Sequence, residues 1–222
     1  MMTSANLNWP TLVTAVDNSR ARESYHHGEL PNVIMSLALA HIEREGTEKL
    51  SLRALAREAG VSQTAPYRHF PTKKCLLAAL ATQGFSELGR QLRIIIDSSQ
   101  PIEERFEQMG FAYVNFALEN PTTYHLMFGS VLADFSEYDM LQRAASDTYA
   151  QVQRCEAELI ETKELQVDPA RFGGVIWAGV HGIASLLLIK REGTQSGDTG
   201  AAIEAMRVDI RDSLRILFGH FF

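Results

Sequence analysis

Apolar residues recur every three or four positions along almost the whole chain from Leu30 onward, and this spacing is the strongest constraint on the fold. A period near 3.6 places such residues on one face of an α-helix rather than on alternate positions of a β-strand. Strand signals are missing, because no alternating Val, Ile and Thr runs are joined by Asn-Gly or Asp-Gly turns. The pattern therefore predicts an all-α protein with about nine helices.

Capping residues and helix breakers divide this pattern into segments. Pro31 suits the first turn of a helix, Gly46 suits the position after its end, and Ser51, Ser62 and Thr72 are good N-caps. Residues 1–24 lack a sustained period and are expected to form a flexible tail, and 193–200 are expected to form a flexible loop. The predicted helices cover residues 31–45, 52–60, 63–70, 73–95, 102–119, 122–129, 138–163, 168–190 and 201–218.

Composition excludes several classes of protein. Hydrophobic residues make up 45% of the chain and charged residues 22%, which is typical of a soluble globular protein. The two cysteines, Cys75 and Cys155, are too few for a disulfide framework, so a reducing cytoplasm is expected. The longest apolar runs, at 75–81 and 183–189, are far shorter than the ~20 residues of a membrane span. A signal peptide is also not indicated, so we expect a cytoplasmic protein with no membrane partner.

Charge is distributed unevenly along the chain, whose formal net charge is −6. Residues 20–93 contain 11 Lys and Arg against 7 Asp and Glu, a balance of +4. Residues 94–222 contain 10 against 19, a balance of −9. This asymmetry indicates two modules, of which the first faces a polyanion.

The most informative stretch is SLRALAREAGVSQTAPYRHFPTKK, residues 51–74. Two short predicted helices are joined by Ala59, Gly60 and Val61, and the small Ala56 lies four residues before the glycine. A helix-turn-helix needs this arrangement, because the small residue lets the helices approach, the glycine permits a sharp turn and the valine fills the junction. The second helix of such a unit enters the major groove of DNA with its N-terminal residues.

In this chain those leading residues are Gln63, Thr64 and Ala65. Glutamine can read adenine through two hydrogen bonds, and the methyl groups of Thr and Ala can contact the thymine methyl group. Donors suited to phosphate follow directly, namely Tyr67, Arg68, His69, Lys73 and Lys74. On these residues alone, a plain helical hairpin with a solvated basic face remains the alternative.

A wider set of spaced residues extends this pattern: Ala40, Gly46, Leu50 to Arg53, Leu55, Ala56, Ala59 to Ser62, Tyr67 to Phe70, Lys73 and Leu76. With this set, residues 25–85 closely resemble the DNA-binding region of the TetR family of one-component transcriptional regulators. The Tyr-x-His-Phe-x-x-Lys run is specific to that family. Further along, WAGVHG at 177–182 is similar to the signature of a branch with a Trp…His-Gly motif in its C-terminal domain.

The resemblance implies an N-terminal three-helix DNA-binding domain at 25–72 and a larger helical effector-binding and dimerisation domain at 73–222. Pro66 departs from an ideal recognition helix by removing one early backbone hydrogen bond, a loss that is tolerable near the first turn. Arg20 and Arg22 would follow the DNA backbone or minor groove. The implied base-reading residues are Arg53, Gln63, Thr64 and Ala65, and the implied phosphate-contacting residues are Ser51, Tyr67, Arg68, His69 and Lys73.

The predicted helix at 168–190 is apolar all round, so we expect it to be buried on every side. Its small residues let another backbone approach closely: Gly173, Gly174, Ala178, Gly179, Gly182, Ala184 and Ser185. Together with the last helix it would form half of an intermolecular four-helix bundle, which matches the family's dimer interface. A twofold dimer would place two recognition helices ~34–36 Å apart, or a multiple of that, on a near-palindromic site.

Trp177 and His181 lie four residues apart on one helix face, and two interpretations of this pair stay open. They form either a packed core pair or the wall of an effector pocket with His181 as a polar anchor. In the helix at 138–163, Leu141, Tyr149 and Leu159 are expected to point inward. The other candidate wall residues, which are equally typical of a core, are Phe106, Met109, Tyr113, Phe116, Tyr124, Met127, Phe128 and Phe135.

Motifs for metal binding and catalysis are missing from the sequence, which has no HExxH, GxSxG, P-loop or dinucleotide fingerprint. We therefore expect no metal, no cofactor and no enzymatic activity. The sequence predicts a homodimeric DNA-binding regulator, a repressor released by a small-molecule effector. Two alternatives remain: a DNA-binding dimer that senses nothing, and a helical small-molecule-binding protein or enzyme with a vestigial helix-turn-helix.

Overall fold

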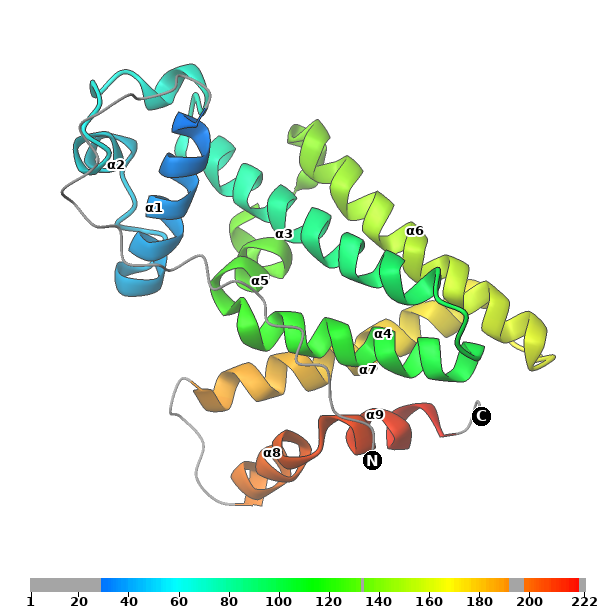
Figure 1. Ribbon diagram of the computed structural model, residues 1–222. Helices are drawn as coiled ribbons and strands as arrows, with labels where there is room; N and C mark the ends of the chain where they lie inside the picture. Colours follow the sequence, from blue (N-terminus) through cyan, green and yellow to red (C-terminus); the bar gives the residue numbers. More distant parts are fainter. Residues whose placement is uncertain (1–28, 133, 192–197, 220–222) are drawn as a thin grey trace.

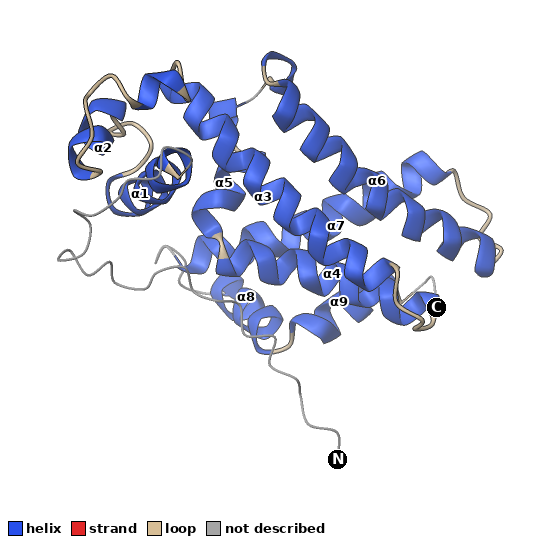
Figure 2. Ribbon diagram, turned by 45° about the horizontal axis from the view of Figure 1, so that its top comes forward, coloured by secondary structure: helices blue, strands red, loops and turns tan. Residues whose placement is uncertain are grey.

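The computed structural model describes residues 29–132, 134–191 and 198–219. Within these ranges the protein is all-α, as predicted (Figures 1 and 2). The predicted tail at 1–24, with Arg20 and Arg22, and most of the predicted loop at 193–200 lie outside the described residues. The helices are α1 (Leu30–Glu45), α2 (Leu52–Glu58), η1 (Pro66–Arg68), α3 (Lys73–Ile96), α4 (Ile102–Glu119), α5 (Pro121–Phe128), η2 (Ser130–Leu132), η3 (Phe135–Glu137), α6 (Asp139–Thr162), α7 (Pro169–Arg191), α8 (Asp198–Val208) and α9 (Ile210–Phe218), where η denotes a 3₁₀ turn.

The helices form a small N-terminal unit and a larger bundle that share α3 (Figure 1). The small unit contains α1, α2, η1 and the first turns of α3, packed around Ile34, Ala38 and Leu55, which are fully buried. In the bundle, α3 lies along α6, and α4 packs between these helices and α7, with α9 against α4. Because α3 belongs to both units, its position links them.

The predicted helix at 63–70 is replaced by a turn and a single 3₁₀ turn, η1. An α-helix beginning after Ser62 would need the backbone N–H of residue 66 to donate to the Ser62 carbonyl. Pro66 has no N–H, and Ala65 donates to that carbonyl instead, at 3.0 Å. The tighter i to i−3 pattern is therefore a consequence of the proline, and the expectation that its loss would be tolerated within an α-helix is wrong.

The predicted last helix, 201–218, is divided into α8 and α9 at Asp209. Asp209 has an extended backbone, with φ −140° and ψ 88°, and its carboxylate accepts a hydrogen bond from the Asp212 backbone N–H at 2.8 Å. Asp209 is thus an N-cap inside the predicted helix. α8 begins at Asp198, so residues 198–200, predicted as loop, are helical.

α7 is the helix of the described chain whose length and hydropathy match those of a membrane span. Its glycines and alanines join the short apolar runs into one long apolar window. It packs against α4, α6, α8 and α9, which is the environment of a helix in a folded domain. The length and hydropathy of α7 are therefore weak evidence for a membrane span.

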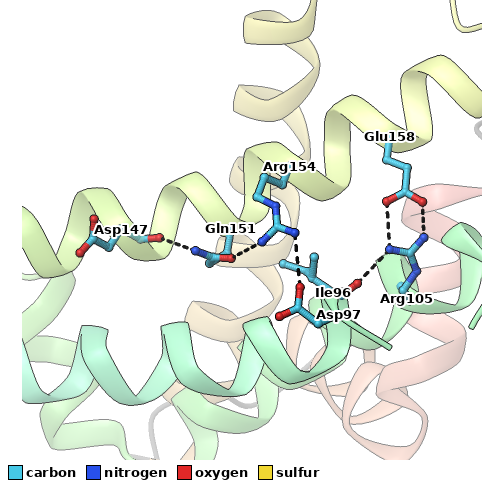
Figure 3. A network of polar contacts seen from close by, with 7 residues as sticks. All are labelled: Ile96, Asp97, Arg105, Asp147, Gln151, Arg154 and Glu158. Atoms are coloured by element: carbon cyan, nitrogen blue, oxygen red, sulfur yellow. Dashed lines mark hydrogen bonds and ion pairs between the residues drawn. The ribbon is translucent and has the colours of Figure 1, made fainter. Parts of the chain in front are cut away.

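Arg105 joins the ends of three helices through the polar network shown in Figure 3. Its buried guanidinium donates to the backbone carbonyls of Ile96 and Gln100, at 3.0 and 2.9 Å, and forms a two-pronged ion pair with Glu158 of α6. Arg154 of α6 also reaches Asp97, at 3.3 Å. The C-terminal end of α3, the start of α4 and the end of α6 are thus joined by charge-assisted hydrogen bonds.

Glu156 of α6 is a buried carboxyl with 4% of its surface exposed. Its Oε1 has no hydrogen-bond partner in the described structure, and a Cβ on Gly173 of α7 would lie only 2.6 Å from its Oε2. Gly173 therefore provides the space that the carboxyl occupies. Burial without a compensating partner raises the pKa of Glu156 to about 7.

We expect this carboxyl to make stability fall as pH rises. The pKa of Glu156 is about 7 in the folded chain against a usual value of 4.5, so the folded state binds more protons between these values. Stability is lost as pH rises through this window. Glu156→Gln should therefore be about 2–3 kcal/mol more stable than the wild type at pH 8 and lose that advantage near pH 4.5. Urea unfolding between these two pH values measures the difference.

Glu161→Gln on the exposed side of α6 is the matched control, with the same change in charge. It should leave the pH dependence of unfolding unchanged. Parallel stability curves for Glu156→Gln and the wild type would contradict the assigned pKa.

Candidate functional site

The turn between α2 and η1 has the geometry that the sequence predicted. Gly60 adopts φ +70°, a left-handed conformation, and a Cβ there would meet open space, so the backbone conformation is what requires glycine. The Val61 N–H donates to the Ala56 carbonyl at 3.0 Å, and Ala56 is fully buried. α2 and η1 are therefore held close together on one side of the N-terminal unit.

Most of the predicted DNA-contacting residues lie at the surface. Ser51, Arg53, Gln63, Thr64, Tyr67, Arg68 and His69 are exposed, and Ala65 and Lys73 are half-buried. Ser51 occupies the N-cap position of α2, but its hydroxyl does not accept a hydrogen bond from the helix, contrary to its predicted capping role. The Ser62 and Thr64 hydroxyls lie 3.3 Å apart at the start of the turn.

The side chain of Lys73, at the start of α3, forms a hydrogen bond within the chain. Its Nζ donates to the backbone carbonyl of Glu48, at 3.1 Å, and so joins the α1–α2 loop to α3. Thr72 caps α3 as predicted, because its hydroxyl accepts a hydrogen bond from the Cys75 N–H at 3.1 Å. The first turn of α3 is thus fixed next to the exposed residues of η1.

The bundle contains an apolar cavity of about 740 Å³. Seven of the predicted wall residues line it: Phe106, Met109, Tyr113, Met127, Phe128, Phe135 and Trp177. Sequence reasoning missed the contributions of α3 and α6, which include Phe85, Leu88, Leu92, Thr148, Tyr149 and Val152. On α3 the apolar stripe was visible in the sequence, but a stripe that lines a cavity has the same spacing as one that fills a core.

Three predicted wall residues lie elsewhere. Phe116 is buried in the core and lines no cavity that the structure describes. Tyr124 and His181 line a separate pocket of about 210 Å³. The ring of His181 lies within 5.7 Å of that of Trp177, so the two residues share a face of α7 as predicted but border different spaces.

His181 is the centre of a hydrogen-bonded group that joins three helices. Its Nδ1 lies 2.8 Å from the hydroxyl of Tyr113 on α4 and 2.7 Å from that of Tyr124 on α5. Burial lowers the pKa of His181 and raises the pKa of both tyrosines, so the imidazole and both phenols are neutral. This contact connects α7 to α5, which in turn packs against α1 and α3.

Two aromatic residues of the larger cavity wall are partly exposed. Tyr149, which was expected to point inward, is 43% exposed, and Trp177 is 48% exposed. Both line the cavity. Outward-facing Val175, Leu186 and Ile189 are also exposed, so in the single chain α7 is not buried on every side as predicted.

Among the described residues there is no group of three or more His, Cys, Asp or Glu side chains that could hold a metal ion. The buried Cys155 thiol has its pKa raised to about 12 by desolvation, so it lacks the thiolate character of a nucleophile. The described geometry thus offers an exposed polar surface next to a helix-turn-helix and a large apolar cavity.

Comparison with known families covers both parts of the chain. Residues 34–80 match the model of bacterial regulatory proteins of the tetR family, and residues 106–209 match that of the tetracyclin repressor-like C-terminal domain. The chain belongs to the TetR family. It is therefore a DNA-binding transcriptional regulator, in which the first match covers the helix-turn-helix and the second covers the cavity wall apart from its residues on α3 and Phe218.

Several individual proteins are similar to this chain. The nucleoid occlusion factor SlmA of Enterobacter sp. (strain 638) is 24% identical over 134 residues, 60% of this chain and 67% of that protein. A protein of unknown function from Rhodococcus sp. RHA1 is 31% identical, with a TM-score of 0.68 over 86% of this chain and 96% of that one. The TetR family regulator PfmR from Thermus thermophilus shares the fold, with 16% identity and a TM-score of 0.58 over 82% and 96% of the two chains.

The different roles predicted for Lys73 and Gln63 can be tested separately by mutation. Lys73→Ala removes a cation from the start of α3, so binding should weaken on all DNA sequences and the salt slope should fall by about 1. Gln63→Ala should instead change the preference at one operator position, with a discrimination of about 1–3 kcal/mol. Fluorescence anisotropy with labelled duplexes at several salt concentrations measures both effects.

Lys163→Ala is the matched control, because it removes the same charge at the opposite end of the bundle, where Lys163 pairs with Glu103. Its salt slope should equal that of the wild type. If Lys73→Ala and Gln63→Ala behaved alike, the division into base-reading and phosphate-contacting residues would be wrong.

Proposed function

We propose that this TetR-family protein is a homodimeric repressor that binds a near-palindromic operator in the cytoplasm. A small molecule in the bundle cavity releases it. We further propose that it belongs to the branch with the Trp…His-Gly motif, because Trp177 and His181 both line pockets in the ligand-sensing part. The observation that supports a sensing role over a regulator that senses nothing is the cavity of about 740 Å³.

An exposed apolar stripe on α7 supports the dimer. Val175, Ala178, Gly182, Leu186 and Ile189 follow one another at intervals of three or four residues and therefore share one face. Val175 is 59% exposed, and Leu186 and Ile189 are each 39% exposed. A continuous exposed apolar face along a helix marks an interaction surface.

The small residues of the stripe support close packing of two copies. A Cβ on Gly174 or Gly182 would meet no atom within 4 Å, so no neighbour within the chain requires glycine at either position. A second α7 crossing here could approach with its backbone. The partner subunit, rather than the chain itself, would then bury the remaining exposed face of α7 and complete its predicted burial.

Residues 25–72 would act as the DNA-binding domain and 73–222 as the effector-binding and dimerisation domain. Arg53, Gln63, Thr64 and Ala65 would read bases, and Ser51, Tyr67, Arg68, His69 and Lys73 would contact phosphates. Without an α-helix at 63–70, the base-reading residues would be presented by a turn whose start is fixed by Pro66.

α3 supports a mechanism of release. Its N-terminal residue, Lys73, lies beside the DNA-contacting surface, and Phe85, Leu88 and Leu92 on the same helix line the cavity. A ligand that pushes on these side chains would tilt α3 about the end held by Arg105. The spacing of the two DNA-binding units would then change, and the ligand would favour one of two states.

The proposal predicts that selection of bound duplexes from a random pool, near physiological salt and without added ligand, recovers a near-palindrome. The half-sites should be separated by about one helical turn or a multiple of it. A cell extract added to the same assay should release the recovered DNA if it contains the effector. Recovery of no sequence above background from folded, dimeric protein would contradict the proposed repressor.

The dimer is tested by Ala178→Arg, which places a charge in the middle of the α7 stripe. We expect the mass in solution to fall from twice that of the chain to the 24.7 kDa of one chain. Light scattering after gel filtration measures this change. Ala157→Arg on the exposed side of α6 is the matched control and should leave the dimer intact. An Ala178→Arg protein that stayed dimeric would place the interface elsewhere.

A further inference from the structure

The wall of the large cavity contains no Asp, Glu, Lys, Arg or His among the residues that the structure describes. Eight of its side chains are aromatic, and Trp177 and Phe128 lie with their ring centroids 6.4 Å apart at one side. Two charged groups of the bundle are engaged elsewhere and do not line the cavity. Arg105 is paired with Glu158, and Glu156 packs against Gly173.

Few polar groups in this wall are available to a ligand. The Thr148 hydroxyl donates within the protein, lying 2.8 Å from the carbonyls of both Phe85 and Ala144. The Tyr113 hydroxyl is occupied by His181 at 2.8 Å. By contrast, the hydroxyls of Tyr149 and Ser130 have no hydrogen-bond partner in the described part of the chain, and Tyr149 is 43% exposed.

The cavity therefore discriminates between possible ligands most strongly by their charge. An ion that left water for an apolar wall without an opposite charge would lose its hydration and gain no ion pair. An uncharged molecule loses much less favourable hydration when it enters the cavity. A free hydroxyl of the wall can form a hydrogen bond with its one or two polar atoms.

We propose that the cavity selects uncharged, mainly apolar molecules and excludes ions of the same skeleton. The hydroxyl of Tyr149 donates a hydrogen bond to the single polar group of the bound molecule. This inference rests on the proposed function only in taking the cavity as the effector site, and it adds the chemical class of the effector.

Two fluorescent probes with one skeleton test this selection. N-phenyl-1-naphthylamine is neutral, and 8-anilinonaphthalene-1-sulfonate is the same molecule with one sulfonate added. We expect the neutral probe to bind at least about tenfold more tightly, since the sulfonate has no cation to pair with in the wall. 1-Decanol, decanoate and decylammonium then compete against the bound neutral probe, and only the alcohol should displace it efficiently.

Two substitutions on α6 locate the bound probe. Ala145 lines the cavity, so Ala145→Trp should fill it and abolish binding, whereas Ala150→Trp on the exposed side of α6 should not. Tyr149→Phe removes only the hydroxyl. It should weaken competition by 1-decanol about threefold to tenfold and leave competition by decane unchanged.

Each outcome has a distinct meaning. Equal or tighter binding of the sulfonate, blocked by Ala145→Trp, would overturn the selection by charge while leaving the cavity as a ligand site. Binding that survived Ala145→Trp would place the probe outside the cavity and also overturn the inference. If no probe bound, both this inference and the effector part of the proposed function would fail, whereas operator selection would still decide the DNA-binding part.

Discussion

The packing of α3 against both units is the constraint on which the rest of the structure depends. This helix has 24 residues and so extends over about 36 Å, from Lys73 beside the helix-turn-helix to Ile96 at the Arg105 cluster. One end is held by hydrogen bonds and an ion pair, and its middle forms part of the cavity wall. Because a helix is stiff along its axis, α3 forms a direct connection between the cavity and the helix-turn-helix, which is what the proposed release mechanism requires.

The cavity and the hydrogen-bonded group around His181 have different roles in the C-terminal part. The cavity has an apolar wall with two free hydroxyls, so it can recognise a ligand by shape and lack of charge. His181, Tyr113 and Tyr124 satisfy one another and hold α4, α5 and α7 together next to that space. A ligand is therefore met by helices whose relative positions are already defined.

The all-α fold could be predicted because helical periodicity and caps are local properties of the chain. Two predicted helices, at 63–70 and 201–218, differ from the structure. The causes at both places are also local, but the sequence pattern predicted a continuous α-helix there. Pro66 removes the hydrogen bond that would start an α-helix at Ser62, and Asp209 caps a new helix inside an apparently continuous stripe. The missing backbone hydrogen bond at Pro66 and the side-chain cap at Asp209 each outweighed a favourable pattern of apolar side chains.

The sequence by itself determined the helix-turn-helix, the TetR resemblance and the apolar character of α7, since each depends on residue types at short spacings. Tertiary structure alone decided which apolar side chains fill the core and which border empty space. Tyr149 and Leu159 belong to one inward pattern, yet Tyr149 faces the cavity and is 43% exposed while Leu159 is fully buried. Spacing along a helix sets the direction of a side chain, whereas only the packing of other helices sets what that side chain meets.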